Sequence, residues 1–185
     1  MRVNSDREWK IRDLIPPSLS HTWHSETFES LNDFTTSHDF NLSMMRNYLP
    51  AEKEAGGRLS PNQLEVLNGE REYVQAPCGS FTWHSHLEEP CVFSVPDWLV
   101  FLRSKTIWSM LLTPESFRVY FKADEFKLAQ ALAAVRGCSS TAIPDTLAYR
   151  RLFKFAKVDS LETDPFLIDR AISGSAGVSV LSPDD

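Results

Sequence analysis

Two histidines and an aspartate near the middle of the chain have the residue types and the spacing of metal ligands. The segment runs His84-Ser-His86, then seven residues, then Ser94-Val-Pro-Asp97. Alternate residues of a β-strand point to the same face, so the two imidazoles can bind one ion at about 2.0–2.1 Å. A carboxylate in the first turn of a following helix completes a set of three protein ligands, and the helix N-terminus favours its negative charge.

A zinc ion held by three protein ligands keeps one position open for water, which suits hydrolysis. The ion lowers the pKa of that water to about 7. The reaction also needs a general base, which accepts the proton of the water and passes it to a leaving amine. An oxyanion needs a hydrogen-bond donor as well, and Ser94 is suitably placed in the sequence for that role.

This segment resembles the signature of the JAMM/MPN metalloprotease family, in which an upstream glutamate is followed by His-Ser/Thr-His-Pro, a spacer and Ser-x-x-Asp. The resemblance covers residues from about 50 to about 122. It implies that His84, His86 and Asp97 bind Zn²⁺. It also implies that Ser94 stabilises the oxyanion.

The family's general base is the upstream glutamate, which is typically followed by a small residue and a glycine at the start of a strand. The segment Glu54-Ala-Gly-Gly57 has this pattern, so the resemblance implies Glu54 as the base. Glu54 precedes His84 by 30 residues, which is similar to the compact prokaryotic, phage or viral members. Glu29, at a longer and more eukaryotic spacing, and Glu52 stay open as alternatives.

The resemblance implies a zinc-dependent peptidase or isopeptidase that hydrolyses a peptide or isopeptide bond. Family substrates end in a flexible or extended tail, so ubiquitin or a ubiquitin-like protein is one candidate, and a processing site in a polyprotein or another partner protein is a second. A metal-free MPN-type scaffold domain is the alternative from a different class. The chain departs from the signature at Leu87, where the family has proline.

The elements that must position these residues are a strand and a helix. Along residues 80–86, Phe81 and Trp83 share one face, and the other face carries both histidines. Ser94 can cap a helix that continues to Arg103, with proline in its first turn.

Helices and short strands alternate in the rest of the chain, which predicts an α/β layered domain. The resemblance implies a mixed, largely antiparallel curved sheet flanked by helices, the layered architecture shared with cytidine deaminases. Hairpins are expected at Asn68-Gly69 and between residues 107 and 121. Helices are expected at 124–135, 145–158 and 164–173, the first with an apolar side made of Phe126, Leu128, Leu132 and Val135.

The predicted organisation is an N-terminal extension (1–45), a catalytic core (46–137) and a C-terminal helical segment and tail that pack on the core (138–185). The net charge of −6 argues against binding nucleic acid. No signal peptide or membrane-spanning run is evident, and three cysteines without a Cys-x-x-Cys pair favour a reducing compartment. We therefore expect a cytoplasmic protein without nucleic acid or membrane partners, and the resemblance implies that its substrate is a protein.

Overall fold

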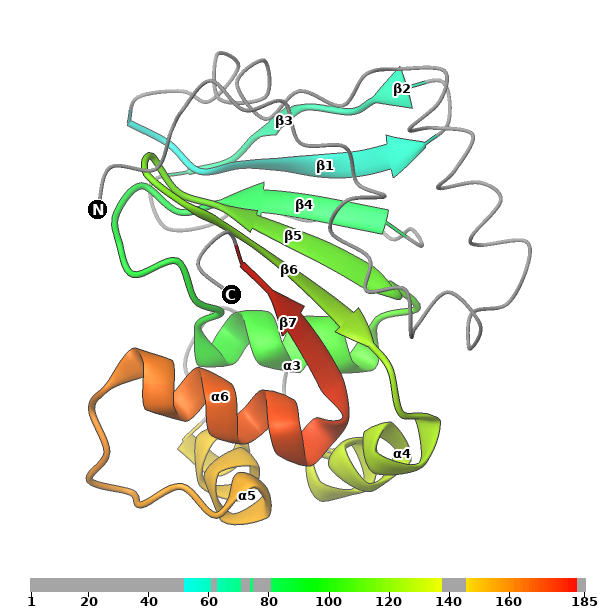
Figure 1. The fold of residues 1–185 in the computed structure, drawn as a ribbon, viewed down its shortest axis with the longest axis vertical. Helices are drawn as coiled ribbons and strands as arrows, with labels where there is room; N and C mark the ends of the chain where they lie inside the picture. The colour runs from blue at the N-terminus through cyan, green and yellow to red at the C-terminus, as the bar shows by residue number, and fades with distance from the viewer. Residues whose placement is uncertain (1–51, 61–62, 71–73, 75–80, 138–145, 183–185) are drawn as a thin grey trace.

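The computed structural model describes residues 52–60, 63–70, 74, 81–137 and 146–182. This part of the chain forms a mixed α/β fold, in which an open and mostly antiparallel sheet packs against helices (Figure 1). The extension predicted for residues 1–45 lies outside the described residues, as do Glu29, Cys78 and Cys138. None of the helices described is long and apolar enough to cross a membrane.

The sheet has the strand order β2-β1-β4-β5-β6-β7, with β3 also paired to β1. The strands are β1 (Ala55–Ser60), β2 (Gln63–Leu64), β3 (Leu67–Asn68), β4 (Phe81–Ser85), β5 (Trp108–Leu112), β6 (Phe117–Lys122) and β7 (Val178–Leu181). β4 and β5 run parallel, and the other pairs are antiparallel.

The parallel pair determines where the predicted metal ligands meet. Parallel neighbours need a crossover connection, and here the crossover contains helix α3 (Val95–Arg103). The start of α3 therefore lies close to the C-terminal end of β4. His84 pairs with Leu111 of β5, and the His86 N–H donates to the Leu112 carbonyl at 2.8 Å, which holds the residue after β4 in line with the strand.

The helices share one apolar cluster with one face of the sheet. They are α3, α4 (Glu125–Ala134), α5 (Thr146–Ala156) and α6 (Pro165–Ala176), and Figure 1 shows them gathered on the same side. Fully buried residues of this cluster include Trp98 on α3, Tyr120 on β6, Leu152 on α5 and Ile172 on α6. Residues 146–182 are therefore packed into the same core as residues 81–137.

The elements nearest the predicted site are confirmed. Ser94 caps α3 and accepts a hydrogen bond from the Asp97 N–H, and the helix buries the apolar side that its sequence predicts. The hairpin expected between residues 107 and 121 is formed by β5 and β6.

Two predictions are wrong. Asn68 is not a turn residue, because it lies in β3 opposite Ala55 of β1. The partner run expected for this hairpin lies outside the described residues except for Val74. Phe126 is not on the buried side of α4 and is 73% exposed. With 3.6 residues per turn, a residue two positions before Leu128 points to a nearly opposite side of the helix.

Candidate metal centre

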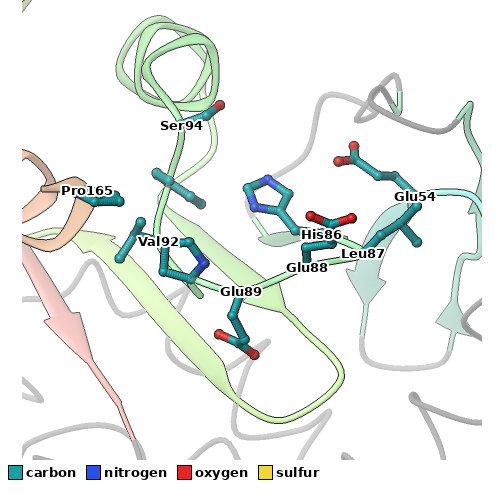
Figure 2. Close-up of a pocket in the computed structure, with 10 residues that line it drawn as sticks. Glu54, His86, Leu87, Glu88, Glu89, Val92, Ser94 and Pro165 are labelled. Carbon is teal, nitrogen blue, oxygen red and sulfur yellow. The ribbon is translucent and has the colours of Figure 1, made fainter. Parts of the chain in front are cut away.

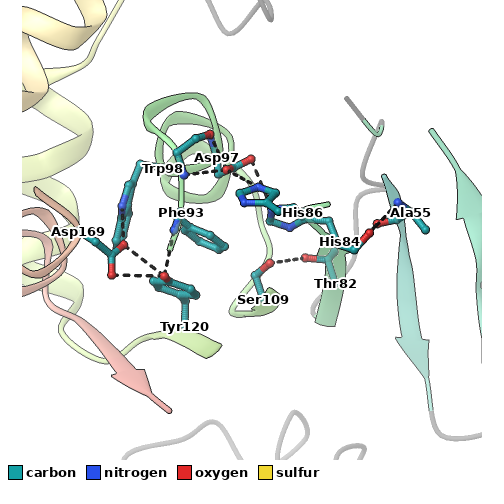
Figure 3. Close-up of polar contacts among 12 residues, drawn as sticks. Ala55, Thr82, His84, His86, Phe93, Asp97, Trp98, Ser109, Tyr120 and Asp169 are labelled. Atoms are coloured by element: carbon teal, nitrogen blue, oxygen red, sulfur yellow. Dashed lines mark hydrogen bonds and ion pairs between the residues drawn. The ribbon is translucent and has the colours of Figure 1, made fainter. Parts of the chain in front are cut away.

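His84, His86 and Asp97 converge at the C-terminal end of β4, as Figure 3 shows. His84 Nε2 lies 3.4 Å from Asp97 Oδ1, and His86 Nε2 lies 3.3 Å from Asp97 Oδ2. One ligand atom from each residue lies within 4.8 Å of the others, so the group can hold a metal ion. Two ligands of a tetrahedral zinc at about 2.0–2.1 Å lie about 3.3 Å apart, which matches both imidazole–carboxylate distances.

The Nε2 atom of His84 supplies a second test of the fit. His84 is 8% exposed, and within the described part of the chain this buried nitrogen makes no hydrogen bond, although it faces the Asp97 carboxylate. A buried polar atom without a partner costs about 1–3 kcal/mol, so such atoms are rare unless a ligand satisfies them. A cation between His84 and Asp97 would use the free lone pair of a neutral imidazole, so the residues present fit a metal ion.

The charges of the three side chains depend on one another. Burial alone raises the pKa of Asp97, but the imidazoles of His84 and His86 outweigh burial and hold that pKa well below its usual range. Burial alone lowers the pKa of His86, but the hydrogen bond and charge of Asp97, together with the charge of Glu54, raise it. Asp97 is therefore ionised at neutral pH, which is the form that binds a cation.

Ser94 and Asp97 form a capping box at the start of α3. The Ser94 N–H donates to Asp97 Oδ2 at 2.8 Å, and the Asp97 N–H donates to Ser94 Oγ at 3.3 Å. The Ser94 hydroxyl also donates to Asp97 Oδ2. These bonds hold Asp97 in one orientation, with Oδ1 directed at His84. The capping box alone accounts for Ser94-x-x-Asp97, so the histidines carry the argument for a metal.

A pocket of about 370 Å³ opens beside His86, the member of the group that lines it. Its wall includes His86, Ser94, Glu54 from the start of β1, and Pro165 from the start of α6 (Figure 2). Figure 2 shows the Glu54 and His86 side chains on the same part of this wall, and the charge of Glu54 raises the pKa of His86. The structure thus brings the predicted base and oxyanion helper to one pocket with a predicted ligand.

Close packing explains the small residues that follow Glu54. A Cβ atom on Gly57 would lie 1.8 Å from the Glu65 carbonyl oxygen, so no larger residue fits there. The backbone of Ala55 is held by Ser85, whose Oγ accepts from the Ala55 N–H at 2.9 Å. Ser85 was not singled out in the sequence, yet it stands between the two histidines and positions the strand that starts after Glu54.

The other candidates occupy different places. Glu52 is exposed and does not line the pocket, whereas Glu29 lies outside the described residues. Cys91, between the histidines and Ser94, is 3% exposed, and burial raises the pKa of its thiol to about 12. The thiol donates to the Leu111 carbonyl, and Cys91 is not in the group of described side chains that lie close enough to share an ion.

Comparison of the chain with protein-family models, with curated proteins and with solved structures found no match. The geometry of the site and the resemblance in residues 84–97 are therefore the basis for a functional conclusion.

Proposed function

We propose that this chain is a zinc-dependent peptidase or isopeptidase of the JAMM type. The observation that carries the proposal is the buried Nε2 of His84, which makes no hydrogen bond to the described residues and is directed at the ionised Asp97. His84, His86 and Asp97 would bind the ion. Two imidazoles and one carboxylate are ligands that catalytic zinc prefers, and three protein ligands leave a position for chemistry.

When bound, zinc would supply Lewis-acid chemistry, by lowering the pKa of water towards 7 and polarising the substrate carbonyl. Glu54 would accept the proton of the attacking water and return it to the leaving amine, since its carboxylate shares the pocket wall with His86. The proposed base and a proposed ligand thus line the same pocket.

Ser94 would donate a hydrogen bond to the oxyanion that forms on the substrate carbonyl. Its hydroxyl now donates to Asp97 Oδ2, so the role requires the hydroxyl proton to turn from Asp97 towards the pocket that Ser94 lines. Asp97 Oδ2 keeps the hydrogen bond from the Ser94 N–H during this turn. The ligand therefore stays oriented while the hydroxyl acts on the substrate.

The resemblance supports a protein substrate with an extended tail, such as ubiquitin, a ubiquitin-like protein or a processing site in a partner protein. A metal-free scaffold domain is the second candidate. It is favoured by the capping box, because Ser94 already provides hydrogen-bond partners for Asp97 without an ion. A metal-free scaffold would leave His84 Nε2 buried without a hydrogen bond to any described residue, so we prefer the enzyme.

The experiment that tests the proposal measures zinc content and cleavage in the same purified full chain. We expect about one zinc per chain after reconstitution, and chelator-sensitive cleavage of a peptide-linked or isopeptide-linked ubiquitin-like substrate. Zinc below about 0.1 per chain after reconstitution would exclude the enzyme and leave the scaffold. Full zinc occupancy without cleavage of either the peptide-linked or the isopeptide-linked substrate would restrict the proposal to a metal site.

A further inference from the structure

A buried carboxylate on α6 contacts the segment that carries Ser94 and Asp97. Asp169 is 1% exposed, and its Oδ1 accepts a hydrogen bond from Trp98 Nε1 at 3.0 Å. Trp98 directly follows Asp97 in α3, so this hydrogen bond anchors the first turn of the helix from the side away from the histidines (Figure 3). Asp169 therefore holds one end of the segment.

Tyr120 connects Asp169 to the other end of the segment. Its hydroxyl donates to Asp169, at 3.2 Å from Oδ1 and 3.3 Å from Oδ2, and accepts a hydrogen bond from the Phe93 N–H at 3.0 Å. Burial and the charge of Asp169 raise the pKa of Tyr120, so its hydroxyl stays a donor. Because Phe93 directly precedes Ser94, the same carboxylate also holds the start of the segment.

The ring of Phe93 extends this connection to a predicted ligand. Phe93 stacks on Tyr120 with ring centroids 3.7 Å apart, and its ring also lies 5.5 Å from that of His84. The imidazole of His84 is thus packed against a ring whose backbone is held through Tyr120. We call Asp169, Trp98, Tyr120 and Phe93 the Asp169 network.

We propose that Asp169 is a positioning residue for the metal centre, which orients Asp97 through Trp98 and His84 through Tyr120 and Phe93. The inference rests on the proposed zinc function. Groups that orient metal ligands through hydrogen bonds typically change metal affinity by about 10–100-fold when they are removed. A network that only joined α6 to the sheet would contribute to stability and leave metal affinity unchanged.

The test measures zinc affinity by chelator competition in the full-length wild type and in Asp169→Asn. The amide replaces one carboxylate oxygen by an N–H₂ donor, which faces either Trp98 and Tyr120 or Tyr120 and Arg118. No orientation of the amide therefore keeps all of the hydrogen bonds that the carboxylate accepts. We expect zinc affinity to fall by about 10–100-fold. We also expect the visible absorption bands of the cobalt-substituted protein to change, because they report ligand geometry.

A matched control separates positioning from stability. Ile172 lies on α6 three residues after Asp169, is fully buried in the core, and makes none of the hydrogen bonds of the Asp169 network. Ile172→Ala should destabilise the fold and leave zinc affinity within about twofold of the wild type, since its loss is one of packing. An equal loss of affinity in Ile172→Ala would overturn the inference.

Tyr120→Phe and Trp98→Phe keep the test decisive if Asp169→Asn fails to fold. Each removes one arm of the Asp169 network, and each should lower zinc affinity less than the loss of Asp169 does. Tyr120→Phe should also speed hydrogen exchange at the Phe93 N–H in metal-free protein. If both variants bind zinc as tightly as the wild type, the inference about Asp169 is overturned and the proposed function stands. If the wild type itself binds no zinc, the proposed function is overturned.

Discussion

Two carboxylates, Asp97 and Asp169, lie on either side of the start of α3, and their surroundings differ. Asp97 lies next to two imidazoles, and one imidazole nitrogen close to it makes no hydrogen bond to the described residues. Asp169 is enclosed and accepts hydrogen bonds from Trp98, Tyr120 and Arg118. The imidazoles lower the pKa of Asp97, whereas burial raises the pKa of Asp169 to about 6.

The difference distinguishes a carboxylate that could receive a ligand from one that supports the fold around it. A polar group whose hydrogen bonds are complete gains nothing from an added cation, but an unpartnered buried nitrogen does. His84 Nε2 makes no hydrogen bond to the described residues, so we expect a metal ion to act there. Asp169 has its partners, so the account predicts that its effects reach the metal only through the backbone and the packed rings.

The largest effect is expected when a ligand is removed. His84→Ala should lower zinc affinity by more than about 100-fold, which exceeds the loss expected when a residue that only orients a ligand is removed. It should also abolish cleavage. Asp97→Asn should also lose zinc, but the amide oxygen keeps the hydrogen bond from the Ser94 N–H, so α3 stays capped. Zinc titration and circular dichroism of both variants measure this. Wild-type zinc affinity in the two variants would rule out the coordination.

Removal of the base should affect cleavage alone. Glu54→Gln should lower kcat by about 10²–10⁴-fold, because the amide cannot accept the proton, and zinc content should be unchanged. Glu52→Gln is the matched control, because Glu52 is exposed and does not line the pocket, and its kcat should match the wild type. Loss of zinc from Glu54→Gln would instead identify Glu54 as a ligand.

The contribution of Asp169 to the free energy of unfolding should fall as pH rises. A carboxylate whose pKa is lowered by an ion pair would show the opposite dependence. Folding raises the pKa of Asp169 from 3.8 to about 6, since burial outweighs Arg118 and the hydrogen bonds from Trp98 and Tyr120. Its contribution to stability is therefore complete below the unfolded pKa and lost as pH rises through about 6. Cys91, the other titratable group that interacts with it, is a neutral thiol throughout this range.

The measurement is the free energy of unfolding of wild type and Asp169→Asn, each from about pH 4 to about pH 7. The advantage of the wild type should fall by up to about 3 kcal/mol over this range. Both proteins share the other titrating groups, so these cancel in the difference. An advantage that grows with pH would contradict the raised pKa.

The smallest effect is expected from Arg118, which pairs with Asp169 at 3.3 Å and is partly exposed. Arg118→Met removes a charge that lowers the Asp169 pKa, so the pH at which Asp169 loses its stabilising contribution should rise. The variant should also lose about 1 kcal/mol or less of unfolding free energy at neutral pH. Lys105→Met removes the same charge from an exposed position and should leave the transition where it is. An unshifted transition in Arg118→Met would show that the Arg118 charge does not lower this pKa.

The parts of the site that sequence spacing predicts are the local ones. His84 and His86 share a face because a strand alternates, and Ser94 caps α3 because a hydroxyl three residues before a carboxylate makes a capping box. Glu54 could be chosen only through the resemblance, since its approach to His86 depends on β1 pairing with β4.

The Asp169 network could not be predicted, because its hydrogen bonds join residues 49 and 71 positions apart. Strand β7 was missed for a related reason. Its four residues are too short to show a period, and it is positioned by Gly177, whose positive φ of 67° ends α6 and starts the return to the sheet. Such long-range contacts depend on how the helices pack, which local patterns do not reveal.

The most direct test of the account is an anomalous difference map at the zinc edge from a crystal of the full chain grown with zinc. The account predicts one peak, about 2.0–2.2 Å from His84 Nε2, His86 Nε2 and an oxygen of Asp97. No peak at this place, with both histidines still directed at the Asp97 carboxylate, would contradict it.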